Sequence, residues 1–354
     1  MSPTLAFEPD LKIAPTGQPD QPMVLIPLDD LIGRPPEYID TAAELLRRSL
    51  PLTVGILHSP APQQLQPVLD ALTCSLTAAP NSGNRRLVHV PDVDAAVSTL
   101  GKAVDRSPRA SVACGQLLRQ TSALDTAGAL AAEAAVYSML LGGTEFHRWL
   151  AERGTPRTRV APNRPLVRLT RADDHLSIVL DHPERRNALS FRLREELLEA
   201  LKFAAADPTV SDLEISGTGP SFCSGGDLDE FGTASDIVAA YLVRLARAPW
   251  RVLEQLSSRA IIQVHGGCIG AGAELASFGG KVIAAPDTFF EFPEVHMGLV
   301  PGAGGTVGVP RRIGRWRAAW LLLTGERLDA PAALDWGLVD AIAVSQFETS
   351  GNPA

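Results

Sequence analysis

Two glutamates, Glu274 and Glu294, lie in one glycine-rich stretch of the chain, residues 267–305. Glu274 follows Gly-Ala-Gly-Ala and Glu294 follows Phe-Pro, a spacing that lets both carboxylates converge on one ligand. Two carboxyl groups that lie close together and are partly desolvated titrate as a coupled pair, so that one can accept a proton while the other gives one. The two residues therefore indicate acid–base chemistry. The alternative for Glu294 is an ordinary exposed turn, which Phe-Pro-Glu also suits.

A second block, Ser-Phe-Cys-Ser-Gly-Gly-Asp at 221–227, precedes this stretch. Together the two blocks closely resemble the enoyl-CoA hydratase/isomerase (crotonase) superfamily. Further groups occur in the family's order: Asn-Ala-Leu-Ser at 187–190, Arg-Ile-Gly at 312–314, Leu-Thr-Gly at 323–325 and Gly-Leu-Val-Asp at 337–340. The resemblance extends from about residue 166 to residue 340. The residues before it lie outside.

The resemblance implies an acyl-CoA thioester substrate and an oxyanion hole made of two backbone N–H groups. Such reactions pass through an enolate-like state, and preorganised N–H donors hold the negative charge on the thioester oxygen. Matched to the family, the expected donors are Ser224 and Ala271. Ala271 would lie in the first turn of a helix, where unpaired N–H groups and the helix dipole favour an anion.

Hydratases of this superfamily keep both glutamates, which together hold the water that adds across a conjugated double bond. The resemblance thus implies that Glu274 deprotonates the water and Glu294 delivers a proton to the α-carbon of a 2-enoyl-CoA. In isomerases one glutamate commonly shuttles the proton, so the presence of both favours hydration. Isomerisation, decarboxylation, thioester hydrolysis and carbon–carbon cleavage stay open. An alternative of another class is a non-catalytic acyl-CoA-binding subunit of a complex, although two desolvated carboxylates argue against it.

The CoA part of the substrate needs its own contacts. Arg185 and Arg186 could meet CoA phosphates or could be solvated loop charges. In the family, backbone groups around Ala188-Leu189 and Gly226-Asp227 surround the adenine and pantetheine. The remaining expected substrate contacts are glycines of the two blocks, Gly225, Gly270 and Gly272. No metal and no cofactor is expected, because coenzyme A enters as part of the substrate.

The composition, with 45% hydrophobic and 20% charged residues, is that of a globular protein. A net charge of −8 without a Lys/Arg block argues against nucleic acid and anionic membranes as partners. Cys74, Cys114, Cys223 and Cys268 stand singly without metal-ligand spacing, which suits reduced thiols in the cytoplasm. No apolar run reaches the roughly 18 residues that a membrane helix needs.

A chain of 354 residues predicts two domains. We expect a flexible arm at 1–21, an N-terminal α/β domain at 22–153, a linker at 154–165 and a catalytic domain with a crotonase-like ββα-superhelix at 166–354. In the N-terminal domain, strand-like runs at 24–26, 52–57, 87–90 and 110–114 alternate with helical patterns at 63–76 and 93–104. The catalytic domain opens with a hairpin pattern at 166–180 and a helix capped by Ser190.

One hypothesis makes the N-terminal domain a degenerate crotonase-like repeat, because Ala-Leu-Ala-Ala-Glu at 129–133 faintly echoes Ala-Gly-Ala-Glu at 271–274. The alternative is an unrelated α/β domain. Crotonases usually continue past the Gly-Leu-Val-Asp block into helices that close the pocket and build a trimer, whereas this chain ends at Ala354. We expect a helical stretch at 127–150, broken at Gly142-Gly143, to replace that cover. A homo-oligomer is expected, with the family's trimer left open.

Overall fold

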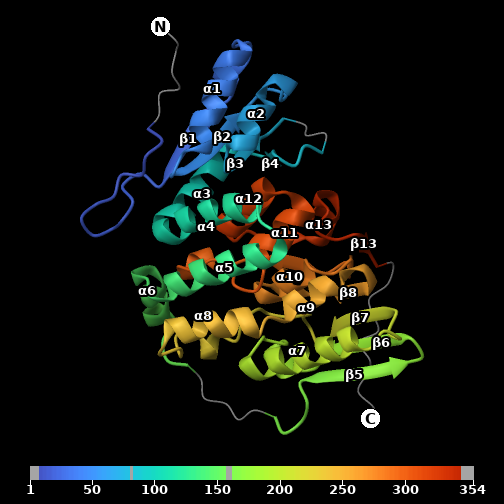
Figure 1. The fold of residues 1–354 in the computed structure, drawn as a ribbon. Coiled ribbons are helices and arrows are strands. Elements are labelled where there is room, and N and C mark those ends of the chain that lie inside the picture. Colours follow the sequence, from blue (N-terminus) through green and yellow to red (C-terminus); the bar gives the residue numbers. More distant parts are fainter. Residues whose placement is uncertain (1–7, 80–82, 157–161, 344–354) are drawn as a thin grey trace.

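The computed structural model describes residues 8–79, 83–156 and 162–343. These residues form an elongated molecule with a sheet toward each end and a layer of helices between them (Figure 1). The first strands of the chain form one end, and the strands that follow the predicted linker form the other.

Four parallel strands form the N-terminal sheet in the order β1-β2-β3-β4. The elements are β1 (Met23–Pro27), α1 (Pro36–Arg47), β2 (Leu52–Leu57), α2 (Gln66–Ala71), β3 (Cys74–Thr77) and β4 (Val88–His89). The predicted strands at 24–26, 52–57 and 87–90 are confirmed. The prediction of one helix over 63–76 is wrong at its end, because α2 stops at Ala71, Leu72 is extended, and β3 follows.

The fourth predicted strand, 110–114, is also wrong, since these residues lie in helix α4 (Pro108–Thr121). A five-residue apolar run fits a strand and a buried helix equally well. The start of α4 decides between them. Pro108 occupies its first turn, and the carboxylate of Glu145 accepts hydrogen bonds from the N–H groups of Arg109 and Ala110 at 2.9 and 3.0 Å.

A layer of helices follows the first sheet. Besides α4 it contains α3 (Val93–Arg106), α5 (Thr126–Leu141) and α6 (Thr144–Arg153). The predicted break at Gly142-Gly143 is confirmed, because α5 ends and α6 begins on either side of it. Asp125 caps α5 by accepting a hydrogen bond from the N–H of Gly128 at 2.7 Å. This layer packs against the late helices α11 (Gly305–Ile313) and α12 (Arg315–Thr324).

Six strands form the second sheet in the order β13-β10-β8-β7-β6-β5, parallel except for the β5/β6 hairpin. A smaller sheet has the order β12-β11-β9. The strands are β5 (Val167–Ala172), β6 (His175–Leu180), β7 (Asp212–Gly217), β8 (Ala260–Val264), β9 (Gly267–Ile269), β10 (Lys281–Ala284), β11 (Phe289–Glu291), β12 (Leu328–Asp329) and β13 (Ala341–Ile342). The remaining α-helices of this part are α7 (Phe191–Ala206), α8 (Ile237–Ala246), α9 (Pro249–Gln255), α10 (Ala271–Ala276) and α13 (Ala330–Trp336). The predicted hairpin is confirmed, and so is the cap at Ser190, whose hydroxyl accepts from the N–H of Leu193 at 3.3 Å.

One cluster of buried apolar side chains runs through both halves of the chain, from Leu52 in β2 to Val339 after α13. A smaller cluster lies beside α1 and α2 and includes Leu46 and Leu69. The N-terminal part therefore shares a core with the second half, and its bounds as a separate domain stay a prediction. The repeat hypothesis is unconfirmed, since β1 to β4 are all parallel whereas the second sheet starts with a hairpin.

The segments at the two predicted boundaries are only partly described. Residues 1–7 of the expected arm and 157–161 of the expected linker lie outside the described residues. The described part of the arm makes hydrogen bonds to the rest of the protein, and its flexibility stays a prediction. The N–H of Leu50 donates to the carbonyl of Pro9 at 2.8 Å, and Arg109 donates to the carbonyl of Thr16 at 2.8 Å.

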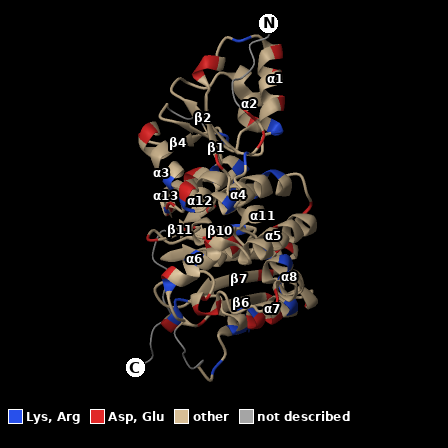
Figure 2. Ribbon diagram, turned by 90° about the vertical axis from the view of Figure 1, so that its left-hand side faces the viewer, with Lys and Arg blue, Asp and Glu red and all other residues tan. Residues whose placement is uncertain are grey.

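Acidic and basic residues are interspersed along the ribbon rather than gathered by sign (Figure 2). Within the described part of the chain, none of the helices combines the length and the apolarity that crossing a bilayer requires. The four cysteines are buried free thiols.

Candidate active site

Two glycine-containing loops meet at the start of α10. They follow β7 and β8, so both leave the carboxyl ends of neighbouring parallel strands. The backbones of Cys223 and Cys268 pair as an isolated parallel β-bridge that joins the two loops. A Cβ on Gly270 would lie 3.7 Å from the Cα of Gly225 and only 2.4 Å from Glu294 Oε1. Gly270 also has a φ of 47°, which glycine adopts without strain. Glycine at this position thus lets two loops and a carboxylate come together.

The N–H of Ala271 is open to a ligand. Ala271 is the first residue of α10, and no residue that the structure describes accepts a hydrogen bond from this N–H. The N–H of Ser224, the predicted partner donor, donates to the carbonyl of Arg186 at 3.0 Å, and its place in the oxyanion hole stays a prediction.

Gly226 carries a further N–H near the start of α10. Leu189 donates to the carbonyl of Gly225 at 2.7 Å and accepts from the N–H of Asp227 at 3.3 Å. Because successive peptide groups of an extended chain point to opposite sides, the N–H of Gly226 points away from Leu189. None of the described residues accepts from it. Gly225 lies against Gly270, where the two loops are in close contact. Gly226 and Ala271, whose N–H groups have no acceptor among the described residues, are the next residues after these two glycines.

Glu274 is buried in α10 with only 1% of its surface exposed. Its Oε2 accepts hydrogen bonds from the N–H groups of Ala303 and Gly305 at 2.7 and 2.8 Å. Burial raises the pKa of Glu274 well above its usual range, and the negative charges of Glu294 and Glu133 act in the same direction. The two N–H donors oppose this shift because they stabilise the ionised carboxylate.

Glu294 follows β11 and is 8% exposed. Its Oε2 is buried and has no hydrogen-bond partner among the described residues. Burial raises its pKa to about 8; a hydrogen bond from its own backbone N–H opposes the rise, and the charges of Glu133 and Glu291 add to it. An unpartnered buried carboxyl oxygen favours the neutral form. The two predicted catalytic glutamates are therefore both buried but have different surroundings, and the exposed-turn alternative for Glu294 is wrong.

Helices from the N-terminal part cover this site. Tyr137 of α5 packs on Gly302, where a Cβ would lie 2.4 Å from Tyr137 Cδ2. The backbone N of Phe146 in α6 would lie 2.5 Å from a Cβ on Gly298. The helical stretch at 127–150 thus packs on the loop that precedes α11, and its role as a replacement for the family's cover stays a prediction. It also brings in a third buried carboxylate, Glu133, which the sequence pattern marked only as an echo of Glu274.

The residues expected to contact CoA differ in whether their polar groups already have partners within the protein. The guanidinium of Arg185 pairs with Asp227 and, at 2.8 Å, with Asp229, so it joins two loops rather than facing an open phosphate site. Arg186 is exposed, and no acidic group of the described residues pairs with it. The N–H of Ala188 donates to the carbonyl of Arg185 at 3.0 Å, and Leu189 uses both its backbone groups on the loop at 225–227. Gly272 is needed for packing, since a Cβ there would lie 2.6 Å from the carbonyl O of Cys223.

Asn187 holds the loop before α7 to the first glycine loop, a role that the sequence did not reveal. It is fully buried with a φ of 54°, and its side-chain NH₂ donates to the carbonyls of Thr218, Ser221 and Phe222 at 2.8 to 3.1 Å. Its Oδ1 accepts from the N–H of His182 at 2.7 Å.

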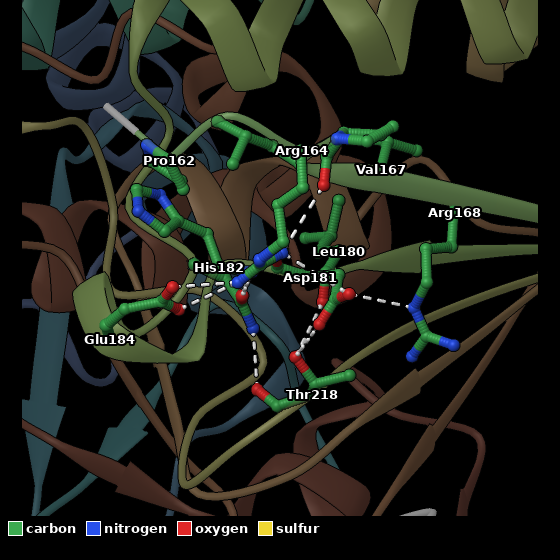
Figure 3. A network of polar contacts seen from close by, with 12 residues as sticks. Pro162, Arg164, Val167, Arg168, Leu180, Asp181, His182, Glu184 and Thr218 are labelled. Carbon is green, nitrogen blue, oxygen red and sulfur yellow. Dashed lines mark hydrogen bonds and ion pairs between the residues drawn. The ribbon is translucent and has the colours of Figure 1, made fainter. Parts of the chain in front are cut away.

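A polar network on the outer side of this loop adds to the anchoring (Figure 3). Arg164 pairs with Glu184 at 2.8 Å, and Asp181 accepts from Arg168 at 2.9 Å and from the hydroxyl of Thr218 at 2.9 Å. The loop that carries Arg185 and Arg186 is therefore fixed on both sides.

Sequence comparisons identify the family. A family model described as enoyl-CoA hydratase/isomerase matches residues 174–349. The chain is 35% identical over 172 residues to the 2,3-dehydroadipyl-CoA hydratase of Escherichia coli K12, which covers 49% of this chain and 67% of that protein. It is 37% identical over 169 residues to the 1,2-epoxyphenylacetyl-CoA isomerase of the same organism, which covers 46% of this chain and 64% of that protein. A crystal structure of an enoyl-CoA hydratase from Thermoplasma volcanium is 31% identical and covers 52% of this chain and 73% of that chain, with a TM-score of 0.47.

The chain belongs to the enoyl-CoA hydratase/isomerase (crotonase) family, and its second half has the mixed α/β content of the crotonase fold. It spans about two thirds of the length of these relatives, with 64% for an enoyl-CoA isomerase/hydratase of Mycosarcoma maydis. The helices α3 to α6 lie outside the matched segment. Because the relatives include a hydratase and an isomerase, the match sets the family and leaves the reaction open.

Proposed function

We propose that this protein hydrates the double bond of a 2-enoyl-CoA thioester. The observation that carries the proposal is the difference between the two buried carboxylates. Burial raises the pKa of both glutamates, but Glu274 Oε2 accepts from two N–H groups that favour the ionised form, whereas Glu294 Oε2 has no partner among the described residues. Such a pair suits a reaction that needs one base and one acid at the same time.

In the proposed reaction, the thioester oxygen accepts hydrogen bonds from the N–H groups of Gly226 and Ala271. Ionised Glu274 takes a proton from water while the water oxygen bonds to the β-carbon. The electrons of the double bond move onto the thioester oxygen as an enolate, which the two N–H groups stabilise. Protonated Glu294 then gives its proton to the α-carbon as the enolate collapses. Glu274 ends protonated and Glu294 ionised, so one proton exchange between them restores the starting pair.

A cavity beside Gly302 supports a place for the acyl chain. Its volume is about 220 Å³, and it is lined by α5 on one side and by the region of α8 and α9 on the other. Most of its lining is apolar, including Leu130, Ala131 and Trp250. Three charged residues also line it: Glu133, Arg244 and Arg251. For the CoA phosphates we propose Arg186, which is exposed and unpaired among the described residues, and we assign Arg185 to holding the loops together.

Self-association of the protein is a second part of the proposal. Four apolar side chains of α8 are 37% to 67% exposed: Ile237, Val238, Leu242 and Val243. Burying such a face against another copy would remove apolar surface from water. Light scattering after size exclusion measures the mass, and a monomer at micromolar concentration would contradict this part.

The proposed reaction is tested by following the absorbance of the conjugated thioester with matched panels of 2-enoyl-CoA and 3-enoyl-CoA esters. Loss of conjugation from 2-enoyl esters supports a hydratase, and gain of conjugation from 3-enoyl esters would show an isomerase instead. Glu274→Gln and Glu294→Gln should each lower kcat by at least about a hundredfold, while an inactive CoA thioether still binds. Unchanged rates in both variants would refute the proposal, and tight binding without turnover would favour a binding subunit.

A further inference from the structure

The turn that opens helix α11 is held by two carboxylates from opposite halves of the chain. Four successive N–H groups, those of residues 303–306, point out of this turn. Ala303 and Gly305 donate to Glu274 Oε2, as described above. Between them, Gly304 donates to Glu133 Oε1 at 2.6 Å and Thr306 donates to Glu133 Oε2 at 2.8 Å. The hydroxyl of Thr306 donates a third hydrogen bond to Glu133, also at Oε2, at 2.7 Å.

This alternation is unusual in its electrostatics. The first N–H groups of a helix have no partner within the helix, and the helix dipole makes them attractive to an anion. One carboxylate would satisfy that need. Here two share the same turn, and both are almost fully buried, with 2% of Glu133 and 1% of Glu274 exposed. Two carboxyl groups that share one turn and are both shielded from water cannot ionise independently of each other.

We infer that Glu133 is a positioning residue for the reaction: it holds the 303–306 turn that binds Glu274, and its negative charge acts on Glu274 across that turn. This inference rests on the proposed role of Glu274 as the base. According to this inference, Glu133 belongs to the catalytic arrangement. It lies on helix α5, which is outside the segment that matches the family. Glu133 itself need not touch the substrate.

The groups around Glu133 fit this role. Burial raises its pKa to about 7, while its bonds to Thr306 and Gly304 and the positive charge of Arg244 on α8 oppose the rise. On α4, burial raises the pKa of the Cys114 thiol, and the charges of Glu294 and Glu133 add to the rise, so this thiol stays neutral. From α5, Tyr137 lies under the guanidinium of Arg244, 3.8 Å from the ring centre. The negative charge of Glu133, on a helix of the N-terminal part, therefore raises the pKa of both Glu274 and Glu294.

A purely structural role is the competing explanation, and the chain offers a matched control for it. Glu145 is also a buried glutamate of the covering helices, and it also accepts two backbone N–H bonds at a helix start, that of α4. It does not share a turn with Glu274. Glu145→Gln therefore removes a comparable cap without changing the charge beside the proposed base.

The experiment compares Glu133→Gln and Glu145→Gln in the full-length protein by the pH dependence of kcat/KM and kcat. Removal of the negative charge at position 133 should lower the pH at which Glu274 ionises, so the acidic limb of the profile should move down by about one pH unit. Loosening of the turn should lower kcat by about tenfold or more with little change in KM. Glu145→Gln should leave the position of the limb unchanged. Thr306→Val, which removes one donor to ionised Glu133 and keeps the side chain at 133, should move the limb in the same direction by less.

A direct readout separates this inference from the proposed function. Carbon-13 NMR of glutamate carboxyl groups, assigned with Glu274→Gln, follows the titration of Glu274 whether or not any thioester is turned over. A downward shift of that titration in Glu133→Gln but not in Glu145→Gln supports the inference even if no enoyl-CoA is a substrate. An unmoved Glu274 titration in Glu133→Gln overturns it, and so does an equal shift in both variants.

Discussion

Replacing Glu294 by glutamine is expected to make the protein more stable in alkaline solution while removing its activity. The pKa of Glu294 rises from 4.5 to about 8 in the folded protein because its carboxyl group is buried. A group whose pKa is higher in the folded state binds its proton more tightly there. Its contribution to stability is therefore complete below its unfolded pKa of 4.5 and is lost as the pH rises toward 8.

The size of this effect follows from the shift. At about 1.36 kcal/mol per pKa unit, the rise corresponds to a loss of about 5 kcal/mol from the free energy of unfolding between acid and alkaline pH. Glutamine has nearly the same shape and stays neutral, so Glu294→Gln escapes this loss. We expect the variant to match the wild type near about pH 5 and to exceed it by several kcal/mol near about pH 9.

Chemical denaturation at several pH values measures the effect, with the slope against denaturant as a check that the unfolding transition is unchanged. Glu133→Gln is a useful second variant, because the pKa of Glu133 rises to about 7 and its share of the loss should be smaller and complete at lower pH. Parallel pH dependences in the wild type and in Glu294→Gln would refute the reasoning that burial raises the pKa of the carboxyl group at this position.

Three further outcomes are expected. Ala271→Pro removes a backbone donor at the first position of α10, where proline is tolerated, so kcat/KM should fall by about 10² to 10³ while the circular dichroism spectrum is retained; an unchanged rate would exclude this N–H from the oxyanion hole. Ala131→Leu should fill part of the cavity and raise KM for long acyl chains more than for short ones, which steady-state kinetics over a chain-length series checks, and an equal effect on all lengths would move the acyl chain elsewhere. Asn187→Ala leaves buried carbonyls unpaired and should lower the free energy of unfolding by about 2 to 4 kcal/mol in a denaturant titration, while a loss below 1 kcal/mol would indicate that water replaces the amide.

The parts of the site that could be predicted from sequence are those fixed by local spacing. Glu274 lies three residues after Ala271, and one helical turn places both at the start of α10. The choice between Ser224 and Gly226 could not be made this way, because it depends on which side of the loop pairs with Leu189. The direction of an N–H group is set by the neighbouring chain, which local sequence does not contain.

The same limit explains the errors in the fold. Residues 110–114 form a helix because Glu145, on a later helix, satisfies the N–H groups at its start. Glu133 was visible only as a glutamate in an alanine-rich helix, since its partners Gly304 and Thr306 lie 171 and 173 residues away along the chain. The alanine-rich composition of residues 127–150 predicted helix α5 correctly, but composition does not identify what a helix covers.

The bond between Glu133 and Thr306 also has a consequence for the order of folding. It closes a loop of 173 residues, and contacts between such distant parts of a chain form late. The strands and helices of each half can form from nearer contacts, but the turn that binds Glu274 is complete only after α5 docks. During synthesis, helix α5 leaves the ribosome long before the turn at residues 303–306 that Glu133 binds. During refolding, the circular dichroism signal of the helices should accordingly return before catalytic activity does. The interval between the two would measure how long the two halves take to dock.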